Sequence, residues 1–285
     1  MKRLIILIAL VLAAGIAGIV RSHSRVHLSE LPSFSGSETR NVRDEVRKSF
    51  ELAPGAHVEV SGINGAVKIE TGNMKTAEVY IERTGESAGA LGRRKITVDA
   101  DPNQLTIHGR KTEDLGFLAS LFGSNPSERV TLKVPRQISL LTKGINGSVT
   151  VGELDGAIEV HAVNGRVEIA GAVGSADLKG INGNIQVNLK QVTNDGVSIS
   201  GINGNIELQL SDLISADLEA HGMNGRVVSD LPNVTIDKNR HGSYSARIGT
   251  GGAMISAHGI NGNIRLSRAT LARTDAAATT STAND

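Results

Sequence analysis

The sequence contains no cysteine and no tryptophan, and aromatic residues make up only 2% of its 285 residues. The absence of cysteine excludes disulfides, thiol nucleophiles, cysteine-ligated zinc and iron–sulfur clusters. The few aromatic side chains leave little material for stacking nucleotide bases or for a sugar site built on aromatic faces. Lysine and arginine total 30 against 29 acidic residues, which gives a net charge of +1. This balance argues against nucleic acid as a partner, because such proteins carry a basic face.

Long hydrophobic runs are confined to the amino terminus, where residues 4–20 are apolar and uncharged and follow Lys2 and Arg3. This pattern predicts a secretory signal peptide or an uncleaved membrane anchor within residues 1–21. The run has 17 residues, which is the lower limit for a membrane-spanning helix of usually ~20. Both alternatives stay open, and both place the rest of the chain outside the cytoplasm, in the periplasm or at the cell surface.

The remainder divides into a polar linker, a β-domain and a tail. Residues 22–50 are mixed and polar, which predicts a linker with one helical turn at residues 42–50. Residues 51–268 carry the repeats described below. The low-complexity residues 269–285 are expected to be disordered.

Glycine is in excess, with 33 residues, and the excess is periodic. A quartet resembling Gly-Ile-Asn-Gly recurs seven times, and successive asparagines are 82, 18, 18, 21, 21 and 37 positions apart. Its Asn and Gly positions are Asn64 and Gly65, Asn146 and Gly147, Asn164 and Gly165, Asn182 and Gly183, Asn203 and Gly204, Asn224 and Gly225, and Asn261 and Gly262. Periods near 20 residues indicate a stacked-repeat architecture.

The segments on both sides of each quartet alternate between apolar and polar residues, which predicts strand–turn–strand units with one buried face. Asn-Gly is also the strongest short hairpin signal, so an antiparallel meander competes with a stacked coil. The residues just before the asparagines are all large and apolar: Ile63, Ile145, Val163, Ile181, Ile202, Met223 and Ile260. Hairpins would place them on a wet face, whereas corners that turn them inward bury all seven.

The sequence therefore favours an all-β, parallel β-helix-like β-solenoid of about seven to nine coils with repeats of 18–21 residues. The glycine after each asparagine predicts a positive φ or a position too tight for a Cβ. The stacked asparagines can form a hydrogen-bonded ladder. Asn146 to Asn224 are expected in five consecutive coils, and the 37-residue step is expected to hide one degenerate coil.

The 82-residue step contains strand-like runs at residues 77–82, 95–99, 105–108 and 130–134. Residues 109–128 between them are interpreted as an insertion. Its apolar residues 115–122 predict either a loop that packs on one end of the solenoid or an element that docks a partner.

Two stretches resemble a known family. Leu132, Lys133, Val134 and Pro135 precede the quartet at Asn146, and a glycine-rich stretch at residues 248–252 precedes the quartet at Asn261. With the repeats, they resemble the bacterial DUF4097 adhesin-like family and the related head GIN domain family over residues 52–268. The resemblance implies an exported β-solenoid with an adhesin-like role, and it brings no catalytic residues with it.

Motifs typical of catalysis are absent from the sequence, which has no Gly-x-Ser-x-Gly elbow, no His-Glu-x-x-His and no Walker loop. We therefore expect no enzyme activity, no cofactor and no metal. One outward pattern of basic and acidic columns suggests a polar ligand face at His161, His221, Glu159 and Glu219. The plainer interpretation is a solvated face with weak cross-strand pairs.

The sequence as a whole predicts an exported, non-catalytic surface or scaffold protein of the adhesin kind. Its expected partner is a protein or glycan of the cell envelope or of the surroundings, together with the membrane if the amino-terminal segment is uncleaved. An envelope-sensing or signalling accessory protein is the alternative. A solenoid enzyme acting on polysaccharide is less favoured, because no pair of acids stands out for glycoside hydrolysis.

Overall fold

The computed structural model describes residues 41–112, 125–239 and 242–269. The expected signal or anchor segment, residues 22–40 of the linker, the apolar residues 115–122 and residues 270–285 of the tail lie outside the described residues. No helix within the described ranges is long and apolar enough to cross a membrane.

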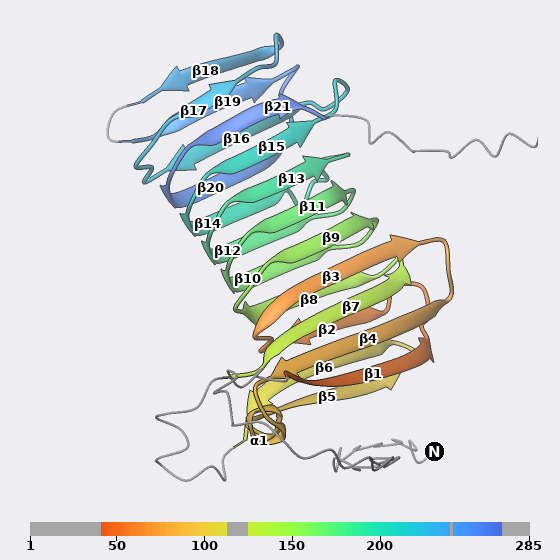
Figure 1. Cartoon of the computed structure of the whole chain (residues 1–285). Helices are drawn as coiled ribbons and strands as arrows, with labels where there is room; N and C mark the ends of the chain where they lie inside the picture. Colours follow the sequence, from red (N-terminus) through yellow and green to blue (C-terminus); the bar gives the residue numbers. More distant parts are fainter. Residues whose placement is uncertain (1–40, 113–124, 240–241, 270–285) are drawn as a thin grey trace, which may run out of the picture.

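The described chain is all-β and consists of two long mixed sheets that lie face to face (Figure 1). Sheet A has the order β1 (Val42–Glu51), β4 (Thr76–Gly85), β7 (Ser127–Pro135), β3 (Gly65–Gly72), β9 (Val149–Leu154), β11 (Val167–Ala172), β13 (Ile185–Leu189), β15 (Ile206–Leu210), β21 (Ile264–Arg268) and β17 (Val227–Ser229). Sheet B has the order β18 (Val234–Lys238), β19 (Tyr244–Ile248), β16 (Ala216–His221), β20 (Ala253–Asn261), β14 (Val197–Asn203), β12 (Ala176–Asn182), β10 (Ile158–Asn164), β8 (Ser139–Ile145), β2 (His57–Ser61), β6 (Gln104–Lys111) and β5 (Arg94–Asp101). One short helix, α1 (Ala88–Gly92), follows β4 and is capped by Ser87.

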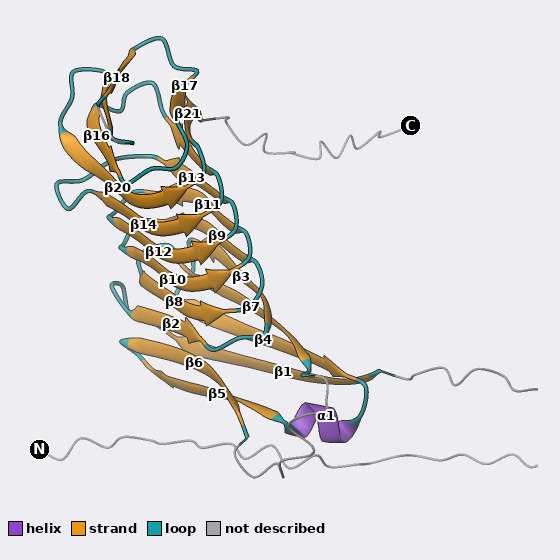
Figure 2. Ribbon diagram, turned by 90° about the vertical axis from the view of Figure 1, so that its left-hand side faces the viewer, coloured by secondary structure: helices purple, strands orange, loops and turns teal. Residues whose placement is uncertain are grey.

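Each Asn site is the point where the chain passes from sheet B to sheet A. The strands on either side of Asn164, β10 and β11, pair with the equivalent strands of other repeats and not with each other. These pairings are parallel and in register, so that Val163 lies opposite Ile181 and Asn164 opposite Asn182. Such pairing excludes a two-residue hairpin at these sites, because a hairpin joins antiparallel neighbours. The same stacking is visible through the middle of the molecule in Figure 2, from β8 to β14 in one sheet and from β3 to β13 in the other.

The core is a thin aliphatic layer between the two sheets. All seven apolar residues that precede the asparagines are buried, which confirms the expectation that they turn inward. Burying a Val, Leu or Ile side chain contributes roughly 1.5–3 kcal/mol, and each repeat adds several such residues on its inward faces. Thr142 is a polar residue within this layer: it is fully buried, and its hydroxyl has no partner among the described residues.

The order of the repeats in space differs from their order in the chain. The repeat at Asn261, formed by β20 and β21, lies between the repeats at Asn203 and Asn224. The expectation of five consecutive coils from Asn146 to Asn224 is therefore wrong at its last step. The expected degenerate coil is also wrong, because β18 and β19 form an antiparallel pair that extends sheet B beyond β16. After Asn224 the chain thus forms β18 and β19 at the end of sheet B, and β20 then returns to lie between β16 and β14.

The amino-terminal end shows a similar rearrangement. Strand β6 pairs with β2, and β7 pairs with β3, so these two strands form one more level of the stack. Gly65, which follows Asn64, is the register partner of Glu128 on β7. The interpretation of residues 109–128 as insertion is thus too wide, because β6 continues to Lys111 and β7 begins at Ser127.

Residues 42–50 were expected to be linker with a helical turn, and they instead belong to strand β1, which pairs antiparallel with β4. Val46 and Phe50 pack against the core, and their spacing of four fits both a helical and a strand period. The antiparallel pairing with β4 makes this segment a strand and not a helical turn. Strands β1, β17, β18 and β5 form the outer edges of the two sheets, and β1 carries several charged residues that discourage edge-to-edge association.

Candidate functional site

The seven asparagines of the quartets stack into one hydrogen-bonded ladder. Six of the seven Nδ2 groups, all except that of Asn64, donate to the Oδ1 atom of the neighbouring asparagine, over distances between 2.8 and 3.1 Å. In spatial order the ladder runs through Asn64, Asn146, Asn164, Asn182, Asn203, Asn261 and Asn224. An asparagine suits this role because its amide carries both a donor and an acceptor. The ladder fixes the corners of the stack along one edge.

The glycine after each asparagine is required by close contact between repeats. A Cβ atom at Gly204 would overlap the backbone carbonyl oxygen of Gly183, and a Cβ at Gly183 would overlap that of Gly165. The same relation holds at the equivalent Gly65, Gly147, Gly165, Gly225 and Gly262. Any larger residue at this position would push two repeats apart.

The first residue of each quartet has a left-handed backbone conformation, which the sequence analysis missed. Gly180 has φ +65° and Gly201 has φ +63°, and the non-glycine Ala162 has φ 53° at the equivalent position. The signal was present, because six of the seven quartets begin with glycine. An alanine in this region is strained, since its Cβ approaches the following carbonyl oxygen.

A buried ion pair closes the ladder at its amino-terminal end. Glu128 accepts hydrogen bonds from the backbone N–H of Asn64 at 2.7 Å and from Arg94 Nε at 2.9 Å, and its side chain is fully buried. The Asn64 amide donates to the carbonyl of Pro126 at 2.9 Å. Removing one partner of such a pair is costly because it leaves a buried charge uncompensated. No motif in the sequence identified Glu128 or Arg94.

The predicted ligand face at His161, His221, Glu159 and Glu219 is not assembled as one site. His161 and Glu159 lie on β10, whereas His221 and Glu219 lie on β16. Strands β12, β14 and β20 separate the two pairs, which corresponds to roughly 19 Å at the usual strand spacing. Strand alternation brings His and Glu to the same outer face, but it does not fix how many strands lie between them. Among the described residues, no group of three His, Asp or Glu side chains is placed to hold a metal ion.

Local pairs occupy this face instead. His161 Nε2 lies 3.1 Å from Asp177 Oδ2, and His221 Nε2 lies 3.7 Å from Glu219 Oε2. Lys143 pairs with Glu59 at 2.9 Å. The hydrogen bond from Lys143, and after it one involving Ser61, holds the pKa of Glu59 below its usual range despite partial desolvation. The contacts of His161 and Lys143 are cross-strand pairs of a solvated sheet surface, and His221 and Glu219 are neighbours on one face of β16.

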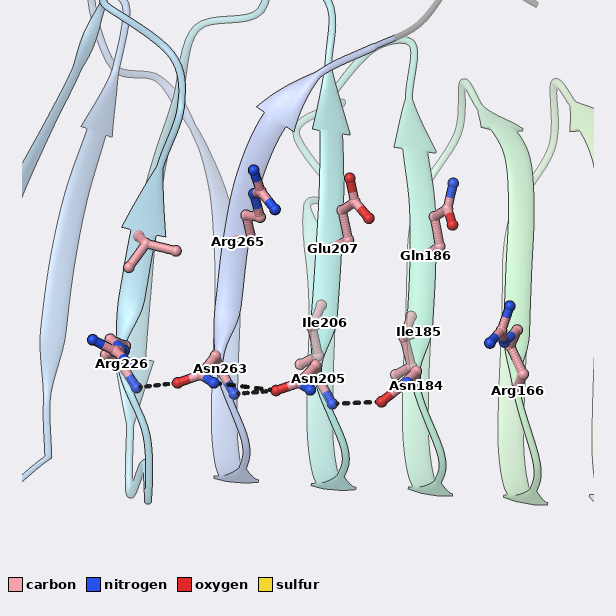
Figure 3. Close-up of a pocket in the computed structure, with 11 residues that line it drawn as sticks. Arg166, Asn184, Ile185, Gln186, Asn205, Ile206, Glu207, Arg226, Asn263 and Arg265 are labelled. Carbon is pink, nitrogen blue, oxygen red and sulfur yellow. Dashed lines mark hydrogen bonds between the residues drawn. The ribbon is translucent and has the colours of Figure 1, made fainter.

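A second row of polar side chains lines an open groove on the outer face of sheet A (Figure 3). These residues lie two positions after the ladder asparagines, just where the strands of sheet A begin. In spatial order the row is Arg166, Asn184, Asn205, Asn263 and Arg226. We call these five residues the donor row. The groove encloses about 550 Å³, and Gln186, Glu207 and Arg265 line it alongside the row.

Hydrogen bonds fix the orientation of the amides in the donor row. Asn184 Oδ1 accepts the backbone N–H of Asn205 at 3.0 Å, and Asn205 Oδ1 accepts that of Asn263, also at 3.0 Å. Asn263 Oδ1 accepts the backbone N–H of Arg226 at 3.1 Å. A backbone N–H is only a donor, so the atom facing it must be the amide oxygen. The Nδ2 groups of Asn184 and Asn205 have no partner among the described residues and remain available as donors.

The three arginines of the groove differ in whether a carboxylate pairs with them. Arg166 forms an exposed ion pair with Glu168 at 3.3 Å. Arg265 pairs with Asp230 at 2.6 Å, and the hydrogen bond with that carboxylate raises the pKa of the guanidinium. The guanidinium of Arg226 has no ion pair or hydrogen bond among the residues that the structure describes. The donor row is therefore positively charged at both ends and rich in unused N–H groups.

The fold and these two rows define a class: an all-β repeat protein of two long sheets whose corners are locked by stacked asparagines. No family model and no curated protein matches the chain, so the resemblance to DUF4097 stays a prediction.

Several solved structures are similar. A "putative cell adhesion protein" from Clostridium sporogenes matches at 14% identity with a TM-score of 0.36, covering 80% of this chain and 100% of its own. A "putative adhesin" from Bacteroides fragilis matches at 10% identity with a TM-score of 0.30, covering 78% of this chain and 97% of its own. A further "putative adhesin" from Parabacteroides merdae matches at 11% identity with a TM-score of 0.30, covering 77% and 95%.

Proposed function

We propose that the chain is a β-solenoid that acts as a non-catalytic binding or scaffold surface outside the cytoplasm, in the manner of an adhesin. The observation that carries the proposal is the donor row on the outer face of sheet A. Repetition holds its five residues at successive strands, each strand pinned by in-register pairing. A rigid linear array of this kind suits recognition of an extended partner better than turnover of a small substrate.

Two further features support a scaffold. The asparagine ladder and the close glycine contacts make the stack stiff along its length. Antiparallel strands cover both sheets at the amino-terminal end and sheet B at the other end. Repeat proteins need terminal capping of this kind to stay in solution. Export is proposed from the apolar residues 4–20 alone. The alternative of a sensing accessory protein rests on residues 115–122, which lie outside the described residues.

The proposal is tested by locating the chain and by identifying what it captures. Cells that produce the full chain with a carboxyl-terminal tag are separated into cytosolic, membrane and extracytoplasmic fractions. The tagged chain is then incubated with solubilised envelope protein and with envelope glycan. We expect the chain outside the cytosol and a specific captured component. A cytosolic chain, or release of reducing sugars from acidic polysaccharides, would overturn the proposal.

A further inference from the structure

We propose that the donor row binds an extended acidic polysaccharide that carries carboxylates, such as a β-linked polyuronate. This inference rests on the proposed function and names the ligand class of the same surface. The hydrogen-bonding groups of the donor row and the spacing of its five residues both favour this class of ligand.

The row offers donors and very few acceptors. The oxygen of each amide faces a backbone N–H of the next strand, which leaves the Nδ2 groups of Asn184 and Asn205 without a partner among the described residues. Arg166 and Arg226 contribute guanidinium groups, which carry no acceptor. The matching ligand is one that exposes acceptor oxygens at regular intervals. Hydroxyl, ring and carboxylate oxygens of a polysaccharide meet this requirement.

The geometry favours a linear chain. The five members occupy five adjacent strands, β11, β13, β15, β21 and the segment before β17, so the two arginines are about 19 Å apart at ~4.8 Å per strand. An extended β-linked sugar chain advances by a comparable step per residue. Several consecutive sugars can therefore meet successive donors without bending.

The charge pattern selects a carboxylated chain over a neutral or a densely charged one. Guanidinium groups at both ends favour carboxylates, which they can bind through two parallel hydrogen bonds. Glu168 and Glu207 lie beside the row and repel a polymer with closely spaced charges such as polyphosphate. The absence of aromatic residues from the groove lining means that contacts to a sugar must be polar rather than stacked. Peptide addition is disfavoured, because the backbone groups here are already paired within sheet A.

The experiment measures binding of the full chain to β-1,4-linked hexamannuronate by isothermal titration calorimetry. The carboxyl-reduced hexasaccharide and inorganic polyphosphate serve as comparison ligands. We expect hexamannuronate to bind at least about tenfold more tightly than either comparison ligand, and more tightly than the disaccharide. Raising the salt concentration should weaken binding, because the arginines are exposed.

Variants locate the site. Arg226→Gln and Arg166→Gln remove one exposed guanidinium each, and each should weaken binding by about tenfold while the melting temperature stays unchanged. Arg110→Gln is the matched control, because Arg110 is exposed on β6 of sheet B and should have no effect. The inference is overturned if wild-type chain fails to bind hexamannuronate, if the carboxyl-reduced ligand or polyphosphate binds equally well, or if Arg110→Gln weakens binding as much as the row variants. Capture of another envelope component in that case leaves the proposed function standing.

Discussion

The Nδ2 group of Asn261 donates a hydrogen bond to Oδ1 of Asn203 at 2.9 Å, although 58 residues separate the two asparagines. Asn224, which lies between them in the chain, is the outermost rung and donates to Asn261 instead. The chain therefore completes the last level of the stack, forms the β18–β19 pair and returns to insert β20 and β21 inside that level. Spatial neighbours at this end of the molecule are not sequence neighbours.

Replacing Gly204 tests the close contact between repeats. We expect Gly204→Val to lower the free energy of unfolding by about 3 kcal/mol or more, because its side chain would overlap the carbonyl of Gly183. Gly92→Ala is the control, since a Cβ there meets nothing within 4 Å. Denaturant unfolding followed by circular dichroism measures both. A neutral Gly204→Val would show that the repeats are not in contact at this corner.

Ala162 provides a test of backbone strain without a change in packing. Its φ of 53° should make Ala162→Gly more stable than the wild type by about 0.5–1 kcal/mol. The reciprocal substitution Gly180→Ala, in the adjacent repeat, should lower the free energy of unfolding by about 1 kcal/mol. A Cβ at Gly180 has ordinary contacts, the nearest atom lying 3.7 Å away, so sterics between repeats do not contribute. Shifts of the same sign in both variants would refute the left-handed assignment.

The ladder predicts a graded cost of losing an asparagine. Asn182 makes two ladder hydrogen bonds, to Asn164 and from Asn203, and Asn182→Ala should cost about 2 kcal/mol. Asn224 makes one, and Asn224→Ala should cost about half as much. Chemical denaturation of both variants gives the comparison. Equal costs would mean that the ladder contributes nothing beyond the loss of a single side chain at a corner.

Acidification should expose the contribution of Glu59. Its pKa is held below the ordinary value of 4.5 chiefly by the hydrogen bond from Lys143. A carboxylate with a lower pKa in the folded state stabilises the protein above the unfolded pKa, and this stabilisation is lost as the pH falls through the folded-state pKa. Glu59→Gln should therefore be less stable than the wild type at pH 7, by at most about 1 kcal/mol for a partly exposed pair. That difference should vanish in acid.

The fold predicted from the sequence matches the structure where the repeat is regular. The prediction and the structure differ where the repeat is interrupted. The spacings of 18 and 21 residues, the inward apolar residue before each asparagine and the tight glycine after it were readable from the pattern. Spatial order was not, because parallel strands of equivalent sequence can pair with any copy, and only the packing of the ends decides which. Val46 and Phe50 illustrate a second limit, since a spacing of four fits helix and strand alike.

The site shows the same division. His161 and His221 were selected because they share a column in the repeat, yet a shared column places residues on one face and not at one distance. The donor row also lies in a column, and its importance appears only when the hydrogen bonds reveal which amide atoms are used. Glu128 and Arg94 come from outside the repeats, and their contact depends on how β5 and β7 close the amino-terminal end.

Paired cysteines test the stacking order most directly, because the chain has no cysteine of its own. Ser198 on β14 is the register partner of Ser256 on β20, so Ser198→Cys with Ser256→Cys should form a disulfide on mild oxidation. Asp177→Cys with Ser198→Cys, which joins register neighbours on β12 and β14, is the positive control.

The decisive comparison is Ser198→Cys with Glu219→Cys. Glu219 pairs with Ser256, and so lies two strands from Ser198, at about 9.6 Å and beyond disulfide reach. Mass spectrometry of the oxidised full chain reads the outcome. We predict a disulfide between positions 198 and 256 and none between positions 198 and 219. A disulfide between 198 and 219 with none between 198 and 256 would contradict the inserted level and restore a stack that follows the order of the sequence.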